Sequence, residues 1–229
     1  NLFDDISSFS QLRRAAYTAK KNARVTHALA SYWVELESNL LRLQIQLQAC
    51  SYRPSPYTTF MIAEPKPRRI QAAPFVDRIV HHSLCHSLAP HLERSYLAHS
   101  FACQKGKGNH KAVLQAKKFA RKFQEGYCLK IDIRHCFETV NHEILMRKLS
   151  KRIRCKKSLR LCEQIISHGG VEGKGLPIGN LSSQHFANFY LDSLDHFCVE
   201  KLNIKGFIRY MDDILLFSHC KDHLVKVLG

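Results

Sequence analysis

The sequence predicts an α+β protein in which a small antiparallel sheet is packed by helices. Two apolar runs, residues 207–211 and 214–217, flank the adjacent carboxylates Asp212 and Asp213, a pattern typical of a β-hairpin with an acidic tip. Leucines recur at helical spacing between residues 36 and 47, which predicts a helical N-terminal region. With 229 residues, 45% of them hydrophobic, the chain can form one large domain or two small lobes.

The charge balance predicts a polyanionic partner. Thirty-five Lys and Arg residues against 19 Asp and Glu residues give a formal net charge of +16, and the basic residues are spread along the whole chain. A charge of this size costs self-repulsion. Binding of nucleic acid explains it better than a surface that is merely solvated.

The nine cysteines form no Cys-x-x-Cys pair, and their odd number argues against a disulfide framework or a structural zinc module. A reducing cytoplasm fits this usage best. No apolar run reaches transmembrane length, and Asp4 and Asp5 make the start unlike a signal peptide, so no membrane partner is expected. The first residue is not Met, which indicates that the chain was processed or cut from something longer.

Residues 4–50 are expected to form two helices that end near Cys50. The basic segment 11–24 either lies on nucleic acid or forms an exposed solvated face, two interpretations of equal weight. Pro54 and Pro56 end this helical region because proline cannot donate to a helical ladder.

A basic β-hairpin should follow, with strands at 58–62 and 69–73. Its cations are Lys66, Arg68 and Arg69. Cations held on a hairpin can reach over a nucleotide triphosphate and stabilise charge during phosphoryl transfer. The residues alone do not tell which of the three points inward.

A helix is expected from residue 74 to about Leu88. Within it His82, Cys85 and His86 lie at helical spacing and could ligate zinc. Helix packing is the preferred interpretation, because no fourth ligand is evident.

Residues 100–110 form a glycine-rich basic loop, with Lys105 and Lys107, that enters a helix near Lys111. Backbone amides and lysines there suit phosphate. No Gly-Lys-Ser/Thr closes the loop as it would in a P-loop, so a plain helix-entry turn is the alternative.

Another acidic residue ends a predicted strand 80 residues before Asp212. Asp132 closes the apolar run 127–131, and adjacent antiparallel strands could bring it opposite Asp212. Carboxylates pinned together repel each other, and a divalent cation would relieve the repulsion. Mg²⁺ prefers an octahedral oxygen shell, so these acids could build a two-metal site for phosphoryl transfer. Taken singly, Asp132 could be a helix-capping acid and the Asp pair a hairpin turn.

The remaining segments are expected to be mainly helical. They are a helix at 141–150, a basic surface patch at 151–157, a rigid turn at 175–184, a helix at 184–202 and a short basic helix at 223–228.

Several motifs, in this order, resemble the reverse transcriptase family. Residues 210–213, Tyr-Met-Asp-Asp, match the Tyr-x-Asp-Asp box of its palm, and Asp132 lies before this box as in the family. Residues 65–70, Pro-Lys-Pro-Arg-Arg-Ile, look like its fingers hairpin. Residues 74–82, Pro-Phe-Val-Asp-Arg-Ile-Val-His-His, are similar to a segment of bacterial reverse transcriptases. The resemblance runs from about residue 39 to residue 217.

The resemblance implies the fingers and palm of a right-hand polymerase, with an antiparallel palm sheet packed by helices and with the thumb missing. It divides the chain into an N-terminal helical segment (1–50), fingers with an interleaved palm helix (51–125) and a truncated palm (126–229). Weak processivity or none is expected unless a parent protein supplies the remainder.

The resemblance also implies RNA-templated DNA synthesis with two Mg²⁺ ions, or Mn²⁺ in their place. The implied catalytic and metal-binding residues are Asp132, Asp212 and Asp213, with the Ile133 carbonyl completing a metal shell. The implied nucleotide-binding residues are Lys66, Arg68 (favoured by the match), Arg69, Phe137 as a steric gate against the ribose 2′-hydroxyl, Pro177, Gly179 and Gln184. The implied nucleic-acid-binding residues are Arg78, Lys105, Lys107 and Tyr210.

The turn at 175–184 indicates a subtype. Many reverse transcriptases have Gln where this chain has Ile178, and the form here, with Ser183 and Gln184, looks like the error-prone enzymes of diversity-generating retroelements. Such enzymes are bacterial or phage-encoded and cytoplasmic. They copy a template RNA from a DNA or RNA primer with dNTPs, and an accessory basic protein is a further possible partner. The alternatives are a group II intron, retron or phage-defence reverse transcriptase, an inactive palm that only binds RNA, and a template-independent enzyme such as a nucleotide cyclase.

Overall fold

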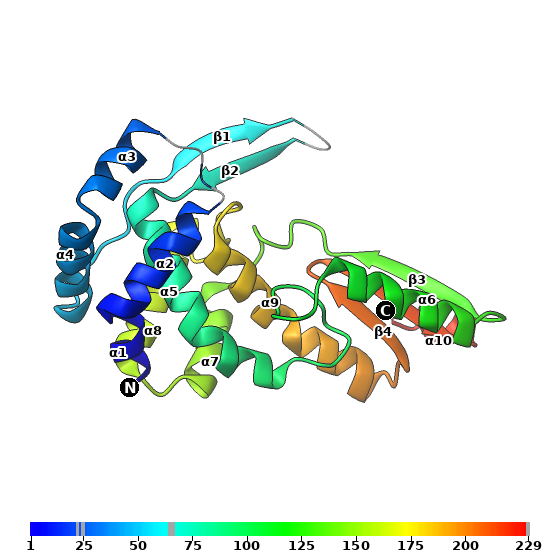
Figure 1. Cartoon of the computed structure of the whole chain (residues 1–229). Helices are drawn as coiled ribbons and strands as arrows, with labels where there is room; N and C mark the ends of the chain where they lie inside the picture. The colour runs from blue at the N-terminus through cyan, green and yellow to red at the C-terminus, as the bar shows by residue number, and fades with distance from the viewer. Residues whose placement is uncertain (22, 24–25, 64–66, 228–229) are drawn as a thin grey trace. The chain divides into compact units, whose positions relative to one another are not determined.

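The computed structural model describes residues 1–21, 23, 26–63 and 67–227 (Figure 1). These residues form two compact units, and each unit contains two separate stretches of the chain. The first unit comprises Asn1–His91 and Phe137–Ser183, and the second comprises Leu92–Cys136 and Gln184–Gly229.

The N-terminal region of the first unit forms four helices where the sequence predicted two. They are α1 (Leu2–Ile6), α2 (Phe9–Lys20), α3 (His27–Val34) and α4 (Leu36–Gln48). The prediction was wrong because polar caps start new helices: the Ser8 hydroxyl accepts from the Gln11 N–H, and the Thr26 hydroxyl accepts from the Leu29 N–H. The leucine spacing was interpreted correctly, since the four leucines of α4 at that spacing are buried.

The predicted basic hairpin is present as β1 (Thr58–Ile62) and β2 (Arg68–Ala72), paired antiparallel. The first unit also contains most of α5 (Phe75–Leu92), together with α7 (His142–Arg152) and α8 (Lys156–His168). Helix α5 ends at Leu92, four residues later than predicted. Helix α8 was not predicted, because its start lies in a run of cations that was interpreted as a surface patch.

The segment between α4 and β1 is fixed to α5 by a buried carboxylate. Asp77, which is 1% exposed, accepts from the Tyr52 hydroxyl at 2.6 Å and from the Ser55 N–H at 2.9 Å. Burial of a carboxylate is tolerated when donors satisfy it, so these bonds set where the chain enters the hairpin.

One turn further along α5, His81 is buried, and both of its ring nitrogens lack a hydrogen-bond partner in the described part of the chain. Burial, with the nearby His82 and His168, lowers the pKa of His81 to about 4. The His81 imidazole therefore binds a proton more tightly in the unfolded chain than in the folded one. The free energy of unfolding should consequently fall by about 3 kcal/mol as the pH drops from 6.5 to 4. Urea unfolding followed by fluorescence of the single tryptophan, Trp33 in the first unit, measures this.

The matched variant is His81→Leu, which removes the titrating group and keeps an apolar side chain at the site. Its stability should fall less steeply than that of the unaltered chain over the same pH range. Equal pH dependence of the two proteins would assign the acid sensitivity to other groups.

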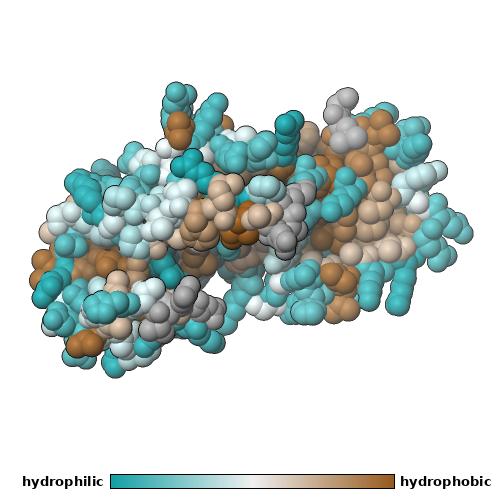
Figure 2. Space-filling model, turned by 90° about the horizontal axis from the view of Figure 1, so that it is seen from above, coloured by the Kyte–Doolittle hydropathy of each residue, from teal (hydrophilic) through white to brown (hydrophobic). Residues whose placement is uncertain are grey.

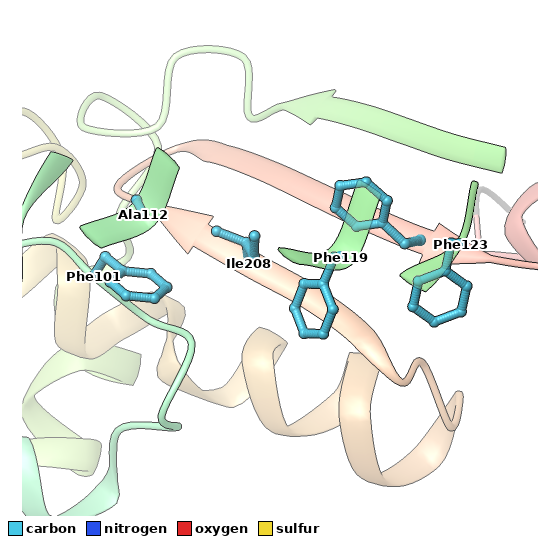
Figure 3. Packing of buried hydrophobic residues seen from close by; sticks show 6 residues of the cluster. Phe101, Ala112, Phe119, Phe123 and Ile208 are labelled. Atoms are coloured by element: carbon cyan, nitrogen blue, oxygen red, sulfur yellow. The ribbon is translucent and has the colours of Figure 1, made fainter. Parts of the chain in front are cut away.

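The second unit contains a three-stranded antiparallel sheet in the order β3-β5-β4, with β3 at Tyr127–Asp132, β4 at Gly206–Tyr210 and β5 at Asp213–Ser218. Helix α6 (Asn109–Lys122) covers one face. Phe119 of α6, with its C-cap Phe123, packs near Ile208 of β4 (Figure 3). The predicted α+β class with an antiparallel sheet packed by helices is confirmed.

A second apolar cluster packs around Phe207, Ile214 and Leu216 of β4 and β5. Its helical partners include Cys198 of the π-helical segment Phe197–Lys201 and Leu224 of α10 (Lys221–Val225). The predicted helix 184–202 is thus α9 (Leu181–His196) followed by this π-helical segment, and the predicted helix 223–228 starts two residues earlier.

The visible face in Figure 2 is largely hydrophilic (teal), with hydrophobic patches (brown) between the polar side chains. In the part of the chain that the structure describes, no helix is both long and apolar enough to cross a membrane.

Candidate active site

The acidic hairpin forms with a register one residue away from the prediction. Tyr210 pairs with Asp213, so the loop of the hairpin is Met211–Asp212 and Asp213 is the first residue of β5. Met211 has a φ of +54°, a left-handed conformation that is unfavourable for a residue with a side chain. Such strain, of about 1–2 kcal/mol, persists where surrounding contacts enforce it.

The strand pairing brings the third carboxylate to the hairpin. Asp132, the last residue of β3, lies opposite Asp213 and not opposite Asp212 as predicted. The Ile133 N–H donates to the Asp212 carbonyl at 3.3 Å, which ties the chain after β3 to the loop. The second unit therefore gathers all three predicted carboxylates at one end of its sheet.

The charges at this end are only partly compensated. Like charges directly opposite each other on a sheet destabilise it, as for Asp132 and Asp213. Lys130 Nζ lies 3.2 Å from Asp213 Oδ1, and both side chains are more than half exposed. An ion pair this exposed contributes at most about 1 kcal/mol, so it would not prevent Asp213 from binding a stronger cation.

These residues fit a hard divalent cation by their chemistry. Three carboxylates and backbone carbonyls are the oxygen donors that Mg²⁺ prefers. Among the described residues, no group of three His, Cys, Asp or Glu side chains converges closely enough to hold a metal ion. Asp213 instead has the Lys130 ammonium group as its neighbour.

The glycine-rich basic loop uses one of its two lysines internally. Lys107 Nζ donates to the carbonyls of Leu97 at 3.3 Å, Ala98 at 2.9 Å and Ser100 at 2.7 Å. Burial lowers the pKa of Lys107, against the opposing effect of Glu93. The ammonium group of lysine has three N–H donors, and those of Lys107 are all used by these three carbonyls, so Lys107 holds the start of the loop together. Lys105, by contrast, is exposed.

Of the other two predicted nucleic-acid-binding residues, Arg78 already has a partner in the first unit and Tyr210 is partly exposed in the second. Arg78 on α5 donates from Nη2 to the Ala19 carbonyl at 2.8 Å, in the last turn of α2, where a cation is favourable. Tyr210, the last residue of β4, is 39% exposed. Gln184 on α9 is exposed, and its Oε1 lies 3.9 Å from Cys103 Sγ.

In the first unit, backbone hydrogen bonds join the turn at 175–180 to Phe137 and to strand β2. The Phe137 carbonyl accepts from the Leu176 N–H at 2.8 Å, and the Ile178 carbonyl accepts from the Gln71 N–H at 2.9 Å. Asn180 was not predicted as a site residue. Its Oδ1 accepts from the Ala73 N–H at 3.1 Å and its Nδ2 donates to the Gln71 carbonyl at 3.0 Å, so its amide pairs with β2.

The hairpin presents its two described arginines on opposite faces, because successive side chains of a strand alternate. Arg69 and Gln71 line a pocket of about 280 Å³. Its other lining residues are Glu138, Gly169, Val171, Lys174, Gly175, Leu176 and Ile178. Arg68 is on the same face as Ile70, and Lys66 lies outside the described residues.

Gly179 lies against the Arg68 face of the hairpin. Its φ is +116°, and a Cβ atom there would lie 2.8 Å from Ile70 Cγ2. Both the conformation and the close approach require glycine. The turn therefore places Gly179 beside Ile70 on one face and Ile178 beside the pocket on the other.

The predicted site residues fall into two groups. The first unit holds Arg68, Arg69, Arg78, Phe137, Pro177 and Gly179, and the second holds Lys105, Lys107, Asp132, Ile133, Gln184, Tyr210, Asp212 and Asp213.

Comparison with known proteins identifies a family and a fold. Residues 63–229 match the family model described as reverse transcriptase (RNA-dependent DNA polymerase). Two Saccharomyces cerevisiae proteins are similar: the putative COX1/OXI3 intron 2 protein is 29% identical over 101 residues, covering 39% of this chain and 11% of that protein. The putative COX1/OXI3 intron 1 protein is 21% identical over 143 residues, covering 58% and 17%.

Solved structures share the fold at low identity. A chain of a partial Cas6-RT-Cas1–Cas2 complex superposes with a TM-score of 0.61 at 21% identity, covering 96% of this chain and 39% of that one. Telomerase from Candida albicans superposes with a TM-score of 0.57 at 12% identity, covering 85% and 44%. The chain thus spans less than half the length of each of these relatives.

Proposed function

The chain belongs to the reverse transcriptase family of RNA-dependent DNA polymerases, and we propose that it copies an RNA template into DNA by adding dNTPs to a primer. The observation that carries this proposal is the pairing of Asp132 with Asp213 beside the Asp212 loop. In the same proposal residues 1–50 are a helical segment, 51–125 are the fingers with an interleaved palm helix, and 126–229 are part of the palm.

The carboxylates would hold two divalent cations, with the Ile133 carbonyl as a further oxygen donor. Bound Mg²⁺ or Mn²⁺ would lower the pKa of the primer hydroxyl and neutralise charge on the departing pyrophosphate. The chain's own contribution is positioning: the sheet fixes two carboxylates opposite each other, and the hairpin cations balance the triphosphate charge.

Binding of template and primer is assigned to the basic surface. Residues 144–162 contain eight Lys and Arg residues and no acidic residue, and most of these cations are exposed on α7, α8 and the connection between them. Contacts between cations and phosphates release counterions, so affinity for RNA should fall steeply with salt. Arg78, Lys105 and Tyr210 are further proposed contacts.

The two arginines of the hairpin should differ in their effect on nucleotide binding. We expect Arg68→Ala to raise the KM for dNTP about tenfold or more, because a charge-assisted hydrogen bond to phosphate contributes about 1.5–3 kcal/mol. Arg69→Ala, on the opposite face, should change this KM by less than about threefold. Steady-state primer extension at varied dNTP measures both, and the reverse order of effects would assign the phosphate contact to Arg69.

As the subtype we propose an error-prone enzyme of a diversity-generating retroelement, acting in the cytoplasm of a bacterial or phage-infected cell. The apolar Ile178 supports this, because it removes a polar contact where many reverse transcriptases have Gln. The intron proteins among the relatives favour an intron-type enzyme as the second candidate.

Primer extension on an RNA template tests both levels of the proposal. Template-dependent DNA synthesis would support the polymerase, and RNA binding without synthesis would support the binding-only alternative. Sequencing the products tests the subtype, because the resemblance to enzymes of diversity-generating retroelements implies frequent errors at template adenines. Errors concentrated opposite template adenines, and reduced in Ile178→Gln, would support the retroelement enzyme. Errors spread evenly over the four bases would favour the intron-type enzyme.

A further inference from the structure

A buried arginine precedes the Tyr-Met-Asp-Asp segment. Arg209 lies in β4, and its side chain and that of Asp195 on α9 are both fully buried. The guanidinium pairs with the carboxylate through two bonds, from Nε to Oδ1 at 2.5 Å and from Nη2 to Oδ2 at 2.7 Å. This bidentate geometry fixes the plane of the guanidinium group, which is the arrangement that arginine offers and lysine does not.

The remaining donors of Arg209 reach Asn188, on the same helix as Asp195, and Ser100, in the connection before α6. Nη1 donates to Asn188 Oδ1 at 2.7 Å, and Nη2 donates to the Ser100 hydroxyl at 3.2 Å and to the Asn188 carbonyl at 3.3 Å. Asn188 in turn donates to the Ala102 carbonyl at 3.0 Å. Together with a bond from Nη1 to the Met211 carbonyl, these bonds give every N–H of the guanidinium an acceptor, as burial of a charged group requires.

One of these bonds acts on the acidic hairpin. Arg209 Nη1 also donates to the Met211 carbonyl at 3.1 Å. Met211 is the left-handed residue of the loop, and its carbonyl carbon is bonded to the nitrogen of Asp212. Because Asp195 fixes the guanidinium plane, it also fixes the direction from which Nη1 approaches this carbonyl.

We propose that Arg209, oriented by Asp195, is a positioning residue that holds the Met211–Asp212 loop in the conformation that presents Asp212 to a divalent cation. This inference rests on the proposed function, because that function assigns the carboxylates to metal binding. Arg209 touches neither metal nor substrate in this role, and it acts through the loop.

Two alterations separate positioning from stability. Arg209→Lys keeps the charge beside Asp195 but loses the planar fork. Arg209→Met combined with Asp195→Leu replaces the ion pair with apolar side chains, which can leave stability unchanged and still removes the bond to Met211. Leu224→Ala is the matched control, since it weakens the apolar cluster beneath the sheet and leaves the Arg209 network intact.

The direct readout is Mn²⁺ binding by the whole chain, measured by electron paramagnetic resonance without nucleic acid, together with the melting temperature. Loss of a group that orients a metal ligand typically costs ten- to a hundredfold in metal affinity. We therefore expect the Mn²⁺ Kd to rise about tenfold or more in both Arg209 variants. Leu224→Ala should melt at a lower temperature with an unchanged Kd.

A Kd within threefold of the unaltered chain in either folded Arg209 variant would overturn the inference, as would absence of Mn²⁺ binding by the unaltered chain. The Mg²⁺ concentration for half-maximal primer extension is scored separately. One outcome is that the unaltered chain extends no primer, while the Mn²⁺ Kd is raised in both Arg209 variants and unchanged in Leu224→Ala. In that case the proposed function fails and the positioning role of Arg209 stands. Primer extension with the same Mg²⁺ dependence in all variants would support the proposed function and overturn the positioning role of Arg209.

Discussion

Asp212→Ala should leave a folded protein that has lost primer extension by about a thousandfold or more. The backbone of the loop does not depend on this side chain, because the Ile133 N–H donates to the Asp212 carbonyl, which alanine retains. In the proposed mechanism the carboxylate is needed only to bind the divalent cations that would stabilise charge in the transition state. A thousandfold corresponds to about 4 kcal/mol of activation free energy, the scale of a preorganised electrostatic contact.

The measurement is single-nucleotide extension on an RNA template at saturating Mg²⁺, with circular dichroism to verify folding. Asp132→Asn should show a comparable loss, since it removes the charge opposite Asp213. Glu125→Ala is the matched control, because this exposed acid lies just before β3 and outside the carboxylate group, and it should extend primer normally. Activity of Asp212→Ala within tenfold of the unaltered chain would remove this residue from the catalytic site.

The carboxylates of the proposed site could be named from the sequence, whereas their register could not. Acids beside apolar strands stand out, so Asp132, Asp212 and Asp213 were all predicted. The partner of Asp132 was off by one residue because the hairpin turns at Met211 and Asp212, and the turn depends on Met211 adopting a left-handed conformation. Methionine gives no sign of that conformation in a sequence, unlike glycine or asparagine.

Buried polar partners were the main omission. Arg209 is a charge inside an otherwise apolar strand, and that signal could have predicted a buried partner. The identity of the partner could not be predicted, because Asp195 and Asn188 come from a helix whose acids and amides look like ordinary surface residues in sequence. Asn180 was missed for a similar reason: its amide pairs with a strand more than 100 residues away along the chain.

Phe137→Val should relax selection against ribonucleotides by about a hundredfold, measured as the ratio of kcat/KM for dNTP to that for the matching rNTP. Phe137 follows Asp132 by five positions, and its carbonyl accepts from the Leu176 N–H, so its backbone is fixed to the turn that contains Pro177 and Gly179. If the ring fills the volume that a 2′-hydroxyl needs, discrimination comes from steric overlap. Removing most of the ring then lowers the activation free energy for the ribonucleotide, relative to the deoxyribonucleotide, by about 2–3 kcal/mol.

Two further substitutions distinguish ring volume from a general loss of packing. Phe137→Tyr keeps the ring and should preserve the selectivity, while Phe197→Val shortens an exposed phenylalanine of the second unit and should leave it unchanged. Because the effect is a ratio of two substrates on one enzyme, a variant that merely folds less well lowers both values and leaves the ratio intact. Equal ratios in Phe137→Val and the unaltered chain would show that another side chain excludes the ribose hydroxyl.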